Sequence, residues 1–324
     1  MLKKVFLLFL PVAFLASCNS VEESVEDNYL TSNDVELAKV YNRIDSISEV
    51  YTNENAETRG MWKLDSQVTR MADNAGRIAG RYAGKYIGGA IGSASANLLG
   101  TVAGYVVGRE LGGIVGSVAA SYAAHKYIST RTRGIVMVPS YKNITMIDKK
   151  VDLDSITIGD LHNLMVMDLL NNGDKYTKKD GSLDYSLLFE DCVVIAGKYG
   201  IDVSDKAYLG SIKPTVMSQT KAITLKAFDC EANNQTPLQF YNKTYLELKG
   251  ICDISKEDYN MAVNLDEKLS DTYLKLDKDN LKKCELEINK TIYNSDLNDE
   301  TKRELQSSNS IVANSTLLWR EPIK

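Results

Sequence analysis

Residues 76–126 repeat with a period of four, which divides them into four rows along a predicted helix. One row is glycine and alanine, its neighbour contains no aliphatic residue, and the other two are mostly apolar. Glycine inside a helix costs about 1 kcal/mol relative to alanine, so the glycine row predicts a surface that another helix backbone approaches closely. The row contains Gly76, Gly80, Gly84, Gly88, Gly92, Gly100, Gly104, Gly108, Gly112 and Gly116.

One straight helix does not fit this pattern. A period of four overshoots the 3.6-residue turn by about 40° per step, so the glycine row would wind around a long helix and no single partner could follow it. The polar segment GSASAN at residues 92–97 interrupts the apolar rows. We therefore predict a hairpin of two helices. This hairpin is expected to place Arg77, Arg81 and Lys85 at its open end, near His125 and Lys126.

The rest of the chain shows mostly helical spacing of apolar residues. Two predicted helices, near 158–172 and from 182, end in the stop signals Asn-Asn-Gly and Tyr-Gly. Pro237 is expected to open another helix, and residues 255–292 and 298–319 add two or three more. Only 134–140 and 201–228 resemble short strands. The fold class is therefore predicted to be mainly α.

The chain begins with two lysines and a short apolar run that ends in Leu15-Ala16-Ser17-Cys18. The run is too short to span a membrane and is typical of a secretory signal. Its end resembles the lipobox of bacterial lipoproteins, which implies lipidation of Cys18. The acidic tether that follows resembles the surface-export signals of Bacteroidetes lipoproteins.

These segments predict five regions. They are a lipoprotein signal peptide at 1–17, a lipidated acidic tether with an N-terminal helix at 18–60, a glycine-zipper hairpin at 61–128, an exposed arginine-containing linker at 129–140, and an α-helical domain at 141–324.

Charge is distributed unevenly along the chain. Residues 19–73 carry a net charge of −7, residues 74–134 carry +6, and residues 135–324 carry −6. The basic groups lie within an apolar segment and do not form a solvated basic face, which argues against a nucleic-acid partner. Residues 86–108 contain no charged side chain, and this length is sufficient to cross about 30 Å of hydrocarbon.

The repeated glycine rows resemble the glycine-zipper segments of bacterial envelope lipoproteins and membrane-active toxins. In outline the chain is similar to secreted Bacteroidetes lipoprotein toxins that are activated by cleavage after arginine. That resemblance implies cleavage at Arg131 or Arg133, with Arg59 as a second position, although all three also fit ordinary solvated loops. It also implies an arginine-specific protease as a partner.

Catalysis and metal binding have little support in the sequence. No nucleophile elbow, P-loop or CxxC pair is present, and the chain has only two histidines. His162 reads as a helix-start or core residue, and we expect no enzyme activity, no cofactor and no metal. Cys230 and Cys252 are a candidate disulfide that would close a loop of about 20 residues, while Cys192 and Cys284 fit either buried thiols or a second pair.

The leading hypothesis is a membrane-active antibacterial lipoprotein whose glycine-zipper helices permeabilise a target membrane. The polar row beside the glycines would then face a wet interior shared by several copies, or face water before insertion. We expect a lipid anchor in the bacterial outer membrane with surface exposure or release, membrane lipid and further copies as partners, and a glycan or protein on the target cell. The alternatives are a structural outer-membrane lipoprotein and a surface binding module with the zipper as internal core.

Overall fold

The computed structural model describes residues 32–54, 62–64, 67–87, 108–131, 157–172 and 174–322. These described residues form ten helices and one pair of short strands, so the prediction of a mainly α fold is confirmed. Cys18 and the signal segment lie outside them. The helices are α1 (Ser32–Glu54), α2 (Gln67–Ile87), α3 (Gly108–Arg131), α4 (Ile158–Asn171), α5 (Tyr185–Lys198), α6 (Lys206–Ala232), α7 (Pro237–Ile251), α8 (Lys256–Leu274), α9 (Lys278–Tyr293) and α10 (Asp299–Trp319).

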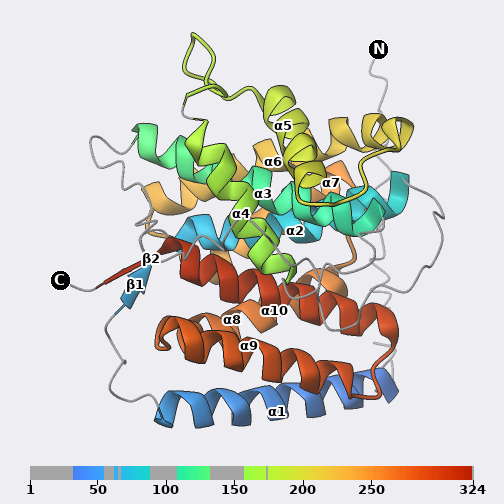
Figure 1. Cartoon of the computed structure of the whole chain (residues 1–324), viewed down its shortest axis with the longest axis vertical. Coiled ribbons are helices and arrows are strands. Elements are labelled where there is room, and N and C mark those ends of the chain that lie inside the picture. Colours follow the sequence, from blue (N-terminus) through green and yellow to red (C-terminus); the bar gives the residue numbers. More distant parts are fainter. Residues whose placement is uncertain are drawn as a thin grey trace, which may run out of the picture.

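Helices α2 and α3 pack against each other at the centre of the molecule, between two groups of outer helices (Figure 1). On one side α2 contacts α8 and α10, with α9 and α1 stacked beyond them. On the other side both central helices contact α6, and α3 also contacts α4 and α5. The central pair is therefore enclosed by helices that follow it in the chain, and α1 packs on the outer side of α8 and α9.

The N-terminal helix α1 packs through Val40 and Ile44 into a hydrophobic cluster with residues of α8, α9 and α10. Farther along, β1 (Trp62–Leu64) pairs antiparallel with β2 (Arg320–Pro322). The chain entering α2 is thus fastened by backbone hydrogen bonds to the chain leaving α10.

Local signals explain where several helices begin. Thr157 and Asp160 form a reciprocal capping box at the start of α4, and Thr236 and Gln239 form another at the start of α7. Pro237 occupies the first turn of α7, where its missing N–H would have no intrahelical acceptor. The helices predicted near 158–172, from 182, and after Pro237 are confirmed, as are the helices within 255–292 and 298–319.

The expectation of short strands within 201–228 is wrong, because this segment forms most of α6. Asp205 caps the helix by accepting a hydrogen bond from the backbone N–H of Tyr208. Leu209, Ile212 and Val216 then follow at intervals of three and four residues and are all buried. Residues 134–140, the other expected strand, lie outside the described residues.

Helix α10 is unusual because its buried surface is largely polar. Ser308, Asn309 and Ser315 are fully buried, and α10 is surrounded by α2, α4, α8 and α9. Their polar atoms are paired within the core; for example, Ser308 Oγ donates to Asn74 on α2 at 3.2 Å. α10 therefore places polar groups at the centre of the fold; Ser308 and Ser315 face α2, and Asn309 faces α8 and α9.

Candidate functional site

The candidate site is the interface between α2 and α3 together with the helices that cover it. Gly76 faces Gly116, and Gly80 faces Gly112. A Cβ atom on any of these four glycines would overlap the backbone of the opposite helix. Glycine is required here because the two backbones are in direct contact, which is the geometry of small-residue helix packing.

The two glycine pairs establish an antiparallel register that is symmetric about residue 96. That position falls within the segment predicted to bend, at residues 92–97. Gly84 continues the interface, since its backbone nitrogen would lie 3.3 Å from a Cβ on Gly112, and Gly108 is the first residue of α3. The predicted row members Gly88, Gly92, Gly100 and Gly104 lie outside the described residues.

The apolar rows of the hairpin are covered by other helices in this structure. From α3, Leu111, Val115 and Val118 join a hydrophobic cluster with α4, α5 and α6. From α2, Ile78 and Ala79 join a second cluster with α6, α7 and α8. No helix in the described part of the chain combines the length and the apolarity needed to cross a bilayer.

Two arginines of the polar row, Arg77 and Arg81, lie against α10 and are buried. Arg77 Nη2 donates to Glu304 Oε1 at 2.5 Å, and Arg81 Nη1 pairs with the other oxygen of the same carboxylate. Arg81 also pairs with Glu110 on α3, at 2.8 Å. Both arginine side chains are at most 3 % exposed. In this structure these two arginines of the row are covered by other helices.

The prediction that Arg77 and Arg81 lie near His125 is wrong. In the observed register, position 77 of α2 faces position 115 of α3, whereas position 125 faces the first turn of α2. His125 stacks on Trp319, with ring centroids 4.7 Å apart. Burial lowers the pKa of His125 to about 4, so its ring is neutral at pH 7.

A third arginine on α2 is held in the same way. Arg70 pairs with Asp266 on α8, and both side chains are almost fully buried. Tyr241 on α7 donates its hydroxyl to the second oxygen of Asp266, and burial raises the pKa of that tyrosine. The Arg70 pair therefore ties α2 to two outer helices.

Between these arginines, Asp73 lies at the junction of α2, α4 and α10. It accepts hydrogen bonds from Ser315 and from the indole N–H of Trp319, the latter at 3.1 Å. Burial raises the pKa of Asp73 to about 7, in spite of these donors. Its neighbour His162, with Nε2 at 3.6 Å, is fully buried in the first turns of α4, and burial lowers its pKa to about 4.

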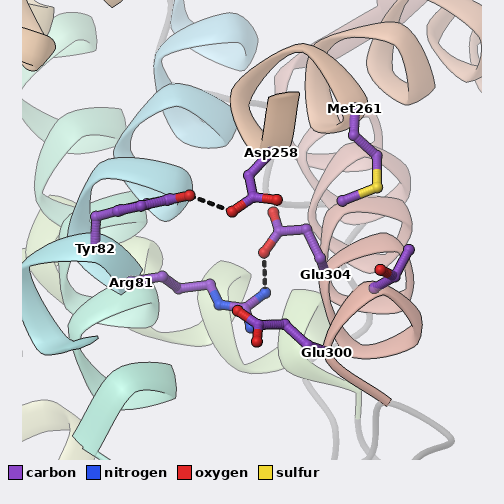
Figure 2. Close-up of a pocket in the computed structure, with 7 residues that line it drawn as sticks. Arg81, Tyr82, Asp258, Met261, Glu300 and Glu304 are labelled. Carbon is purple, nitrogen blue, oxygen red and sulfur yellow. Dashed lines mark hydrogen bonds and ion pairs between the residues drawn. The ribbon is translucent and has the colours of Figure 1, made fainter. Parts of the chain in front are cut away.

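A small cleft opens where α2 meets α8 and α10. Figure 2 shows the arginine and tyrosine of α2 pointing toward carboxylates of the other two helices. Tyr82 donates to Asp258, and Arg81 donates to Glu304. The cleft is lined by Arg81, Tyr82, Asp258, Met261, Glu300, Thr301 and Glu304. Among the described residues no group of three or more His, Cys, Asp or Glu side chains has the arrangement of a metal site.

The candidate disulfide between Cys230 and Cys252 does not form in this structure, where both residues are free thiols. Cys252 follows the last turn of α7 and accepts a hydrogen bond from Gln219 on α6. Cys230 lies eleven residues farther along α6, a rise of about 16 Å, which exceeds the reach of a disulfide. Cys192 and Cys284 are buried free thiols.

The structure places Arg131 at the last residue of α3. The other candidate cleavage positions, Arg59 and Arg133, lie outside the described residues.

The carboxylates that hold the hairpin were not identified from the sequence. These three residues, Asp258, Asp266 and Glu304, lie more than a hundred residues after the hairpin. Other acidic residues lie close to each of them in the sequence, and nothing local distinguishes them. A usable signal was the middle of α10, where the polar run QSSNS stands between the apolar residues Leu305 and Ile311. Comparison with family models found no match, and searches among curated proteins and solved structures also found none.

Proposed function

We propose that this chain is a lipid-anchored, membrane-active antibacterial protein whose glycine-zipper hairpin is masked by its own helices until it enters a target membrane. The observation that carries the proposal is the contact of Gly76 with Gly116 and of Gly80 with Gly112. Such a contact depends on van der Waals packing and weak Cα–H···O bonds, which do not require water. The hairpin interface would therefore persist in hydrocarbon.

The surrounding helices fit the role of a mask. α2 and α3 together carry seven basic and two acidic side chains, whereas α8 carries two basic and five acidic side chains. The charged contacts are concentrated where α2 meets α8 and α10, and apolar clusters cover the remaining faces. Separation of the hairpin requires these buried ion pairs to be broken, so the masked state is stable until a trigger acts.

Cleavage after Arg131 or Arg133 is the proposed trigger. A cut there would leave the hairpin joined to the anchored N-terminal part and separate it covalently from α4–α10. The hairpin would then be retained only by non-covalent contacts. The segment is suited to a protease because it follows directly on the end of a helix.

A second candidate function is favoured by the burial of the arginines of α2. Arg70 and Arg77 are almost completely enclosed and paired, which also fits a lipid-tethered binding module in which the hairpin is permanently part of the core. A structural outer-membrane lipoprotein, with the zipper in the producer's own membrane, is the other alternative.

Dye leakage from liposomes tests the proposal. Intact protein, protein nicked by an arginine-specific protease, and an Arg131→Gln/Arg133→Gln variant exposed to the same protease would be compared. We expect rapid leakage only from the nicked wild-type protein. Nicked protein that releases no dye, with spin labels at Ile87 and Val107 that stay mobile in the presence of bilayers, would favour the permanent-core module instead.

A further inference from the structure

The three arginines of α2 differ in where their partners lie. Arg70 pairs with Asp266 on α8, and Arg77 pairs with Glu304 on α10. Arg81 shares Glu304 but also pairs with Glu110 on α3, within the hairpin itself. If the hairpin separated from the outer helices, Arg81 would keep its ion pair with Glu110, whereas Arg70 and Arg77 would lose the carboxylates they pair with, and only Asp73, on α2 itself, would remain near them.

The carboxylates leave part of each guanidinium unused. The Nε–H groups of Arg70 and Arg77 are buried and have no hydrogen-bond acceptor. A guanidinium offers five N–H donors in a planar fork, and in this structure Arg70 and Arg77 direct only some of them at acceptors. A phosphate group offers oxygens at several angles and matches the fork in a bidentate arrangement.

Spacing places the two residues on the same face of α2. Positions 70 and 77 are seven apart, which is close to two helical turns and about 10 Å along the axis. A cation near hydrocarbon is costly unless it pairs with an anion or reaches the interface. Two unpaired guanidinium groups on one face therefore favour a location at a negatively charged membrane surface.

We propose that Arg70 and Arg77 form a binding site for the phosphates of anionic phospholipid head groups, which replace Asp266 and Glu304 when the hairpin is released. This inference rests on the proposed function and names the ligand of the released hairpin. Arg81 is excluded from the site because Glu110 stays with it.

The test uses the full-length chain in a Glu304→Gln background, which weakens the mask without cleavage. Binding to vesicles of phosphatidylcholine, with and without phosphatidylglycerol, is measured by flotation, and leakage is measured in parallel. Four further variants each add one substitution to this background: Arg70→Gln, Arg77→Gln, Arg77→Lys or Arg81→Gln. Arg43→Gln, at an exposed position of α1, is the control with the same change of charge. Circular dichroism verifies that each variant is folded.

We expect Arg70→Gln and Arg77→Gln each to weaken binding to the anionic vesicles about fivefold. Arg77→Lys should fall between, because it keeps the charge but loses the fork, and Arg81→Gln and Arg43→Gln should have little effect. Inorganic phosphate at matched ionic strength should not alter tryptophan fluorescence, since the proposed ligand is a head group in a membrane surface.

Equal binding by the Arg77→Gln, Arg81→Gln and Arg43→Gln variants would overturn this inference. Equal leakage from both kinds of vesicle would also overturn it but would leave the proposed function intact. A fluorescence change with inorganic phosphate would assign the site to a free anion. Absence of leakage from either vesicle, in the background variant and in nicked wild-type protein alike, would overturn the proposed function and this inference with it.

Discussion

The two faces of α2 pack in opposite ways. Toward α3, Gly76 and Gly80 bring backbone against backbone, with no charge involved. Toward α8 and α10, Arg70 and Arg77 reach carboxylates on helices that are distant in sequence. The glycine contacts depend on shape alone, whereas the contacts with α8 and α10 depend on charges that are expensive to bury and that could be exchanged for others. The difference indicates which contact can open while the hairpin stays intact.

The largest expected effect comes from breaking the glycine face. Gly80→Leu should lower the free energy of unfolding by more than about 5 kcal/mol, because a side chain there meets the fixed backbone of Gly112 and cannot be accommodated by a rotamer change. Urea denaturation provides the measurement. The matched control is Gly210→Leu on α6, at an exposed position where a Cβ meets nothing within 4 Å. Equal stability of the two variants would show that the backbones are not in contact.

A substitution in the charged face toward α8 and α10 should lower the free energy of unfolding by a smaller but still substantial amount. Glu304→Gln removes the carboxylate shared by Arg77 and Arg81 and is expected to cost about 3–5 kcal/mol, because buried cations lose their partner. Glu247→Gln, in a partly exposed pair with Lys226, is the control and should cost less than about 1 kcal/mol. Thermal unfolding at low and high salt measures both. A loss no greater than that of the control would mean that Glu304 does not hold the hairpin.

Asp73 is expected to make the free energy of unfolding depend on pH. Its pKa is raised in the folded state, from an ordinary value near 3.8 to about 7. The folded form therefore binds the proton more tightly than the unfolded form. The resulting stabilisation is complete below about pH 4 and is lost as the pH rises through about 7.

Relative to an Asp73→Asn variant, the wild-type free energy of unfolding should fall by about 1.4 kcal/mol per pH unit between about pH 5 and pH 7. The comparison is made as a difference because neutral His125 and His162, whose pKa values are lowered to about 4, contribute the opposite slope. Parallel pH profiles of the two proteins would contradict the raised pKa of Asp73.

The smallest effect is expected from reducing agents. Because Cys192, Cys230, Cys252 and Cys284 are free thiols, a reductant should leave the unfolding midpoint unchanged. Four thiols per chain should react with a thiol reagent in denaturant when the protein is expressed without residues 1–18. If the reductant instead lowered the free energy of unfolding by about 3 kcal/mol, a loop closed by a disulfide would be present.

The sequence by itself determined the mainly α fold and the bounds of most C-terminal helices, because these depend on local signals. Examples are the capping residues Thr157 and Thr236, and Pro237 in a first helical turn. It also showed the glycine row, since a period of four is visible without knowledge of the partner. The segment of α6 was misjudged because its helix is fixed by burial against the hairpin and the neighbouring helices, with only a weak amphipathic pattern of its own.

Only the tertiary structure decided what the hairpin packs against. The partners of Arg70 and Arg77 lie more than 190 residues away in sequence, and no local rule selects Asp266 or Glu304 from the other acidic side chains. The separation of Cys230 from Cys252 likewise follows from the antiparallel course of α6 and α7, which no cysteine spacing reveals. Local chemistry specifies a helix and its faces, but which faces meet depends on the packing of the whole chain.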